Sequence, residues 1–254
     1  MVQSSTLTAV TSHITGARFS TYLTPAGGDS RRALELYRWN ILMSGALQES
    51  LGIAEVFLRN TIDTQLKFWN SAQPPRQGIA YGADWIQNPA GPLWALLNPG
   101  GNGRPRKSIY RQSFNRALQD QRRRPPTHRR HRHAVDHNDV LAQLSFGTWN
   151  SLLPRKDDLD PSGIGPENPR RLWTEALHQG FPHHDDPIAI KYWVERLYRL
   201  RNRVAHLEPL CDTDVMSYHR TTARLLRSIE PAIAEWYAGI SRVPAVYQAR
   251  PAIP

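Results

Sequence analysis

The stretch RRALELYRWNILMSGALQESLGIAEVFLRNTIDTQLKFW, residues 31–69, decides the fold class. Its apolar residues recur every three to four positions, with some longer gaps, and this spacing is typical of a helix and not of a strand. The stretch is long for one helix of a globular protein. Because Gly45 and Gly52 lie near its middle, we expect two helices or one kinked helix here.

Helical spacing continues through the rest of the chain, and neither a strand pair nor an internal repeat is evident. Further helices are predicted over residues 108–122, 170–179, 187–208, 214–228 and 232–240, with a shorter one from VLAQL at residue 140. In the region 187–208, Trp193, Leu197, Leu200 and Val204 form a stripe that we expect to be buried. The fold class is therefore predicted as all-α, a helical bundle with loop insertions.

Composition divides the chain into three consecutive parts, of which the second contains an insertion. Residues 1–29 are rich in Ser and Thr and predict a loosely ordered lead-in, with a short helix around residues 17–23 and a cap at Asp29 or Ser30. Residues 30–241 are predicted as one helical domain, with a basic insertion at about 104–133. Residues 242–254 form a C-terminal tail.

The net charge of +10 is concentrated in one segment. Residues 104–133 hold eleven of the 32 Lys and Arg residues and one acid, Asp120, so the remaining 21 basic and 21 acidic residues cancel. Such a patch favours a polyanion, most often nucleic acid. Within RRRPPTHRRHRH, residues 122–133, the candidate RNA-binding residues are Arg122, Arg123, Arg124, Arg129, Arg130 and Arg132. The alternative is a disordered, charged insertion without a partner.

The cysteine content and the length of the apolar runs bear on the cellular compartment of the protein. The single cysteine, Cys211, excludes an intramolecular disulfide framework and favours a reducing compartment. The N-terminal residues lack the pattern of a signal peptide, and no run approaches eighteen consecutive apolar residues. We therefore expect a cytoplasmic protein without a membrane partner.

The segment RLRNRVAHLEP, residues 199–209, places a proton carrier beside fixed positive charge. Asn202 and His206 are four residues apart, share a helix face, and allow the amide to orient the imidazole. Arg201 lies about 140° away from His206 on a regular helix. Either the last turn before Pro209 loosens, or a second copy of the chain completes the site. Alternatively, these side chains only interact with the helix dipole.

The segment RNRVAHLEP resembles the R-x4–6-H signature of the HEPN superfamily of compact helical domains, and the chain is most similar to the bacterial Abi-like (abortive infection) family within it. Three further stretches carry the resemblance in the family's order: LYRWN at 36–40, EVFLRNTID at 55–63 and LSFGTWNSLLP at 144–154. The resemblance covers about residues 30–210, without the basic insertion and the Pro/Gly-rich segment 70–105.

The resemblance implies a homodimer formed through the motif helices and a metal-independent endoribonuclease of a phage-defence or toxin–antitoxin system, with an antitoxin RNA or protein as a further partner. Its products would carry 2′,3′-cyclic phosphate and 5′-OH ends. His206 would be the acid/base, Arg201 the phosphate clamp and Asn202 the orienting group. Supporting residues would be Glu55, Arg59 and Asn60, although Glu55 and Arg59 also suit an ordinary ion pair on a helix face.

Two histidine clusters raise the question of a metal, and neither predicts one. His128, His131, His133 and His137 are loosely spaced among arginines, which repel a cation, and His183, His184, Asp185 and Asp186 suit a solvated turn between two prolines. We expect neither metal nor cofactor. The alternatives to a nuclease are a non-catalytic RNA- or protein-binding module and a DNA-binding regulator that uses the basic segment.

Overall fold

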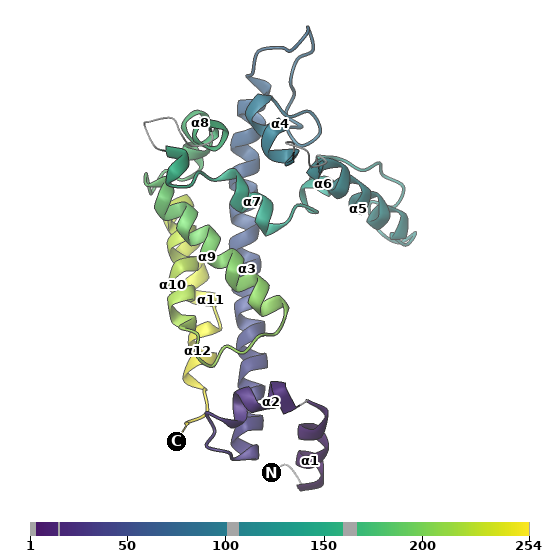
Figure 1. Cartoon of the computed structure of the whole chain (residues 1–254). Helices are drawn as coiled ribbons and strands as arrows, with labels where there is room; N and C mark the ends of the chain where they lie inside the picture. The colour runs from purple at the N-terminus through teal and green to yellow at the C-terminus, as the bar shows by residue number, and fades with distance from the viewer. Residues whose placement is uncertain (1–3, 15, 101–106, 160–166, 254) are drawn as a thin grey trace. The chain divides into compact units, whose positions relative to one another are not determined.

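The computed structural model describes residues 4–14, 16–100, 107–159 and 167–253 (Figure 1). Parts of the predicted segments 1–29, 104–133 and 242–254 therefore lie outside the described residues. Within them the chain is helical and has no β-strand, apart from one isolated bridge between Arg76 and Ile79. The prediction of an all-α protein is confirmed.

Twelve α-helices and two 3₁₀ helices account for the described residues. In chain order they are α1 (Ser4–His13), α2 (Gly16–Leu23), α3 (Ser30–Ser71), α4 (Gly91–Leu97), α5 (Ile109–Arg123), α6 (His137–Leu141), α7 (Phe146–Leu152), η1 (Asp157–Leu159), α8 (Glu167–Glu175), η2 (Leu177–Gly180), α9 (Pro187–Ala205), α10 (Val215–Ile229), α11 (Pro231–Ile240) and α12 (Val243–Gln248).

Helix α3 is one continuous helix of 42 residues, so the alternative of two separate helices was wrong. A glycine inside a helix costs about 1 kcal/mol relative to alanine. The burial of apolar side chains before and after Gly45 and Gly52 outweighs that cost. Large apolar side chains with at most 2% exposure line one face of α3 along its length. They are Leu36, Met43, Leu47, Leu51, Leu58, Ile62 and Leu66.

The N-terminal segment is more regular than its composition predicted. Helix α2 confirms the short helix expected around residues 17–23, whereas α1 was not predicted. Phe19 and Tyr22 of α2 are buried, and the Tyr22 ring meets Tyr37 edge-on at 5.3 Å between centroids. The carboxylate of Asp29 accepts hydrogen bonds from the backbone amides of Arg31 and Arg32, which confirms the predicted cap. The predicted tail also contains a helix, α12.

The chain divides into two compact units. Unit 1 comprises residues 1–54, 196–227 and 231–254, and unit 2 comprises residues 55–195 and 228–230. Helices α3 and α9 each contribute to both units. The single domain over 30–241 stays a prediction.

Each unit has its own core. In unit 1 the indole of Trp39 donates to the Val246 carbonyl at 2.8 Å and so ties α3 to α12. In unit 2 the rings of Trp85 and Trp149 meet edge-on, and η2 approaches α3 at Gly180.

Helix α3 alone, among the described residues, is long and apolar enough to cross a membrane by length and composition. Its most apolar stretch of 18 residues is 44% buried inside the structure. The cytoplasmic location stays a prediction.

Replacement of Gly180 by alanine should destabilise the protein. The added Cβ would lie 2.6 Å from Cγ2 of Thr61, a side chain with little freedom to move, so we expect a loss of about 1–3 kcal/mol in the free energy of unfolding. Urea denaturation measures it. Gly45→Ala is the matched control, since no atom lies within 4 Å of its added Cβ and the helix should gain up to about 1 kcal/mol. A shift in the same direction for both variants would contradict this account.

Candidate active site

The candidate active site lies at the C-terminal end of α9, in unit 1. The predicted stripe is confirmed, because Leu197, Leu200 and Val204 are almost completely buried and Trp193 is 9% exposed. This packing leaves Arg201 on the exposed side of the helix. Asn202 is half-buried, and His206, the first residue after the helix, is exposed.

Helix α9 keeps its regular backbone bonding up to His206 and then ends in a tight cap. The Leu207 amide donates to the Val204 carbonyl and the Glu208 amide donates to the Arg203 carbonyl, each at 3.0 Å. These two bonds form a Schellman motif, whose turning residue, Leu207, has a φ of 51°. A leucine in this left-handed region is strained, since glycine usually takes the position. The helix therefore stops abruptly at His206.

The side chains of Arg201, Asn202 and His206 make no hydrogen bond or ion pair with any residue that the structure describes. The contact between Asn202 and His206 is a backbone bond of 3.1 Å from the His206 amide to the Asn202 carbonyl. The orienting role of the Asn202 side chain thus stays a prediction. Exposed arginine and histidine side chains without protein partners can bind an anion from solution.

Three other side chains hold the turn that follows His206. From α2, Nη2 of Arg18 donates to the Leu207 carbonyl at 2.6 Å. From α9 itself, Nη2 of Arg203 donates to the Pro209 carbonyl at 2.9 Å. The Oδ1 atom of Asn40 on α3 accepts from the Leu210 amide at 2.7 Å. The segment that carries His206 is therefore fixed from three helices.

None of these three residues was predicted from the sequence. Arg203 and Asn40 lie within the quoted segments RNRVAHLEP and LYRWN, so the resemblance could have marked them. Arg203 also reaches the Glu208 carboxylate at 3.1 Å and the Thr213 hydroxyl at 3.1 Å. No sequence signal pointed to Arg18.

The three supporting residues occupy the part of α3 that belongs to unit 2. Glu55 and Arg59 are half-buried, Asn60 is exposed, and the carbonyl of Asn60 accepts from the Thr64 hydroxyl at 2.9 Å. The Nε atom of Arg59 is buried without a hydrogen-bond partner among the described residues. Their convergence with Arg201 and His206 stays a prediction.

The part of the basic segment that follows α5, residues 124–133, is a series of turns held by ion pairs. Arg124 bonds the Asp139 carboxylate at 2.7 Å, and Arg130 bonds Asp136 at 2.7 Å and Asp139 at 2.8 Å. Asp136 and Asp139 also cap α6 reciprocally. Arg124 and Arg130 are therefore committed to internal ion pairs.

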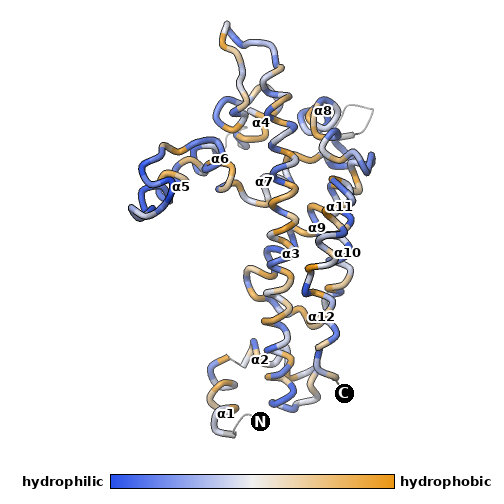
Figure 2. The backbone as a smooth tube through the Cα atoms, turned by 180° about the vertical axis from the view of Figure 1, so that it is seen from behind, coloured by the Kyte–Doolittle hydropathy of each residue, from blue (hydrophilic) through white to orange (hydrophobic). Residues whose placement is uncertain are grey.

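The other four predicted RNA-binding residues of this segment are exposed. They are Arg122, Arg123, Arg129 and Arg132. Figure 2 shows the hydrophilic character of α5 and the loop after it. Arg122 and Arg123 lie in the last turn of α5. Arg129 and Arg132 lie on the loop whose Arg124 and Arg130 form the ion pairs.

No group of three or more His, Cys, Asp or Glu side chains is arranged to hold a metal ion within the described ranges. His131 instead bonds the Arg124 carbonyl at 2.9 Å, and the His184 ring contacts Trp193 edge-on.

The best-formed titratable cluster is centred on His137, in unit 2. Its Nε2 lies 2.7 Å from Asp63 Oδ1 and its Nδ1 lies 2.9 Å from Asp84 Oδ1, so both ring nitrogens donate to carboxylates. Asp63 also accepts from the Trp85 indole at 2.8 Å and pairs with Lys67 at 2.7 Å. The last residue of EVFLRNTID is thus the centre of a buried ion-pair network that joins α3 to α6.

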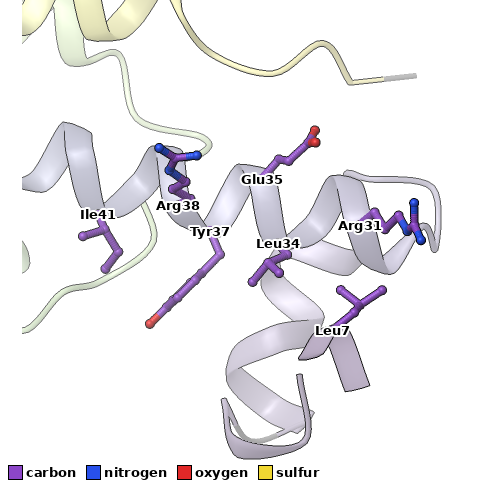
Figure 3. Close-up of a pocket in the computed structure, with 7 residues that line it drawn as sticks. All are labelled: Leu7, Arg31, Leu34, Glu35, Tyr37, Arg38 and Ile41. Atoms are coloured by element: carbon purple, nitrogen blue, oxygen red, sulfur yellow. The ribbon is translucent and has the colours of Figure 1, made fainter. Parts of the chain in front are cut away.

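A pocket of about 720 Å³ lies beside the first turns of α3. In Figure 3 Leu34, Tyr37 and Ile41 point to one side of the helix and Glu35 and Arg38 to the other. No predicted site residue lines this pocket. The candidate site is therefore an exposed helix end and not a pocket. A long polymer can reach such a surface, whereas a pocket suits a small molecule.

No protein-family profile, curated protein or solved structure matches the chain. The geometry of the site therefore has to carry the functional argument.

The His137 network should make stability depend on pH. Burial disfavours the charged ring, but hydrogen bonds to Asp63 and Asp84 outweigh it and raise the pKa of His137 from 6.5 to about 9. Because the folded-state pKa lies above the unfolded value, the stabilisation is complete below about pH 6.5 and is lost as the pH rises through 9. We expect His137→Gln to lower the free energy of unfolding by about 2 kcal/mol at pH 6, with the deficit shrinking by pH 10.

Denaturation in urea at pH 6, 8 and 10 tests this expectation, with His133→Gln as the control because that side chain is exposed. A deficit that stays constant across the three pH values would show that His137 acts only through packing.

Proposed function

We propose that this chain is an Abi-like member of the HEPN superfamily, with a HEPN-like helical bundle, and that it is a metal-independent endoribonuclease. The observation that carries the proposal is the pair of exposed side chains, Arg201 and His206, on a helix end whose following turn is held by three other residues. The R-x4-H pattern, the helical fold and the exposed arginines of the basic segment support it. In a toxin–antitoxin or phage-defence system, the activity would be restrained by an antitoxin RNA or protein.

The proposed chemistry needs little from the protein, because RNA carries its own nucleophile. The 2′-oxygen attacks phosphorus, the bond from phosphorus to the 5′-oxygen breaks, and a proton passes from the former oxygen to the latter. His206 transfers this proton, which contributes about 10²–10⁴ in rate. Arg201 stabilises the charge on the pentacoordinate phosphorane. The products are a 2′,3′-cyclic phosphate and a 5′-OH.

Two copies of the site would divide these roles better than one. On one chain Arg201 and His206 are five residues apart, and no described contact joins their side chains. In the proposed homodimer, the arginine of one subunit and the histidine of the other act on the same phosphate. Asn202 would orient the imidazole once RNA is bound.

A second candidate is a non-catalytic RNA-binding module. The observation that favours it is the group of exposed arginines in the last turn of α5 and the loop after it, which suits a phosphate backbone whether or not the RNA is cut. The two candidates differ in one outcome, since a binding module retains RNA without shortening it.

The first prediction concerns cleavage. Wild-type protein should cut single-stranded RNA in the presence of EDTA and leave cyclic phosphate and 5′-OH ends. His206→Ala should slow the cut by about 10²–10⁴, since it removes the proton carrier, and Arg201→Ala should also slow it. Arg224→Ala, an exposed arginine on α10, serves as the control for Arg201. Intact RNA that stays bound to the wild type under all conditions would favour the binding module.

The second prediction concerns the basic segment. Replacement of Arg122, Arg123, Arg129 and Arg132 by glutamine should weaken RNA binding and reduce the dependence of log K on log salt by about 0.7 for each phosphate that the variant no longer neutralises. Fluorescence anisotropy with catalytically inactive protein measures both. The double variant Arg224→Gln/Arg227→Gln removes exposed charge from α10 and should have a smaller effect. Equal losses from both sets would show a general charge effect, and tighter binding of duplex DNA would favour a DNA-binding regulator.

A further inference from the structure

Asn40 is a fully buried polar residue of unit 1, in the segment LYRWN. Its Oδ1 accepts the backbone amide of Leu210, which is also fully buried, at 2.7 Å. The two residues are 170 positions apart in the sequence. A buried amide that loses its acceptor costs about 1–3 kcal/mol, so this bond strongly favours one conformation of the chain at Leu210.

The bond lies at the point where the turn needs it most. Leu210 is four positions after His206, and between them Leu207 has left-handed backbone geometry that a helix does not enforce. The other two contacts to the turn come from Arg18 and Arg203, and the carbonyls they reach, those of Leu207 and Pro209, belong to residues that are not buried. Only the Asn40 bond joins two residues that are excluded from water, where a hydrogen bond is strongest.

The polar interaction of Asn40 is directed at the turn alone. Its Nδ2 has no hydrogen-bond partner among the described residues, and neither has Oγ of Ser44, one helical turn later on α3. A polar side chain placed only to satisfy the core would use both of its groups.

We infer that Asn40 is a positioning residue for His206: it fixes the turn after α9 and thereby the place of the imidazole. The effect on cleavage rests on the proposed function, whereas the effect on the turn does not. A displacement of about 1 Å in a catalytic group can cost about 10²-fold in rate.

Two variants and one control test this inference. In Asn40→Ser the side chain is too short to reach Leu210, and in Asn40→Asp the acceptor oxygen is kept. The control, Ser44→Ala, removes a buried hydroxyl that has no hydrogen-bond partner among the described residues. Amide hydrogen exchange should quicken about tenfold at Leu210 in Asn40→Ser. Exchange at Leu210 in the other two variants, and at Ile62 in all three, should match the wild type. Asn40→Leu replaces Asn40→Ser if thermal unfolding shows that the latter does not fold.

Cleavage kinetics supply the second readout. Asn40→Ser should lower kcat about tenfold or more with little change in KM, and Asn40→Asp should restore it. Unchanged exchange at Leu210 in Asn40→Ser would overturn the inference, as would fast exchange combined with an unchanged kcat. If wild-type protein cuts no RNA, the proposed function fails, but the exchange experiment still decides whether Asn40 holds the turn.

Discussion

The abrupt end of α9 is the constraint on which the account depends. A helix that ran on past Ala205 would place Leu207 in register with the buried stripe of Leu200 and Val204. Instead, Leu207 adopts a left-handed conformation that is unfavourable for a leucine, and the chain leaves the helix. Such a conformation persists only where the surroundings enforce it, and here Arg18, Asn40 and Arg203 do so.

Charged residues in this chain are divided between two kinds of role. Asp63, His137, Arg124 and Arg130 make ion pairs inside unit 2 and hold α6 and its neighbours in place. Breaking a pair of this kind leaves an uncompensated charge, so its members are poor candidates for binding a ligand. Arg201 and His206 have no partner within the described residues, although they lie on a constrained turn. That contrast separates the candidate site from the many other charged residues.

Periodicity in the sequence was sufficient to predict the fold class, most helices and the buried stripe of α9, because these features depend on neighbours within a few residues. The continuity of α3 was not predictable in this way. The local preference of Gly45 and Gly52 argues for a break, and packing along the whole helix overrides it. The ion pairs that fold the basic segment were missed because their acidic partners, Asp136 and Asp139, lie beyond the segment in the sequence. Asn40 was missed because its partner, Leu210, lies in a distant part of the chain.

The central claim is tested most directly by cleavage of a substrate that lacks one 2′-hydroxyl group. An RNA with a single 2′-deoxynucleotide on the 5′ side of a mapped cleavage site removes the nucleophile that the proposed mechanism takes from the substrate, and it leaves every phosphate unchanged. The account predicts that the protein still binds this RNA but no longer cuts it at that position, while neighbouring sites are still cut. Continued cleavage at the deoxy position would contradict the account, because the attacking oxygen would then have to come from water or from the protein.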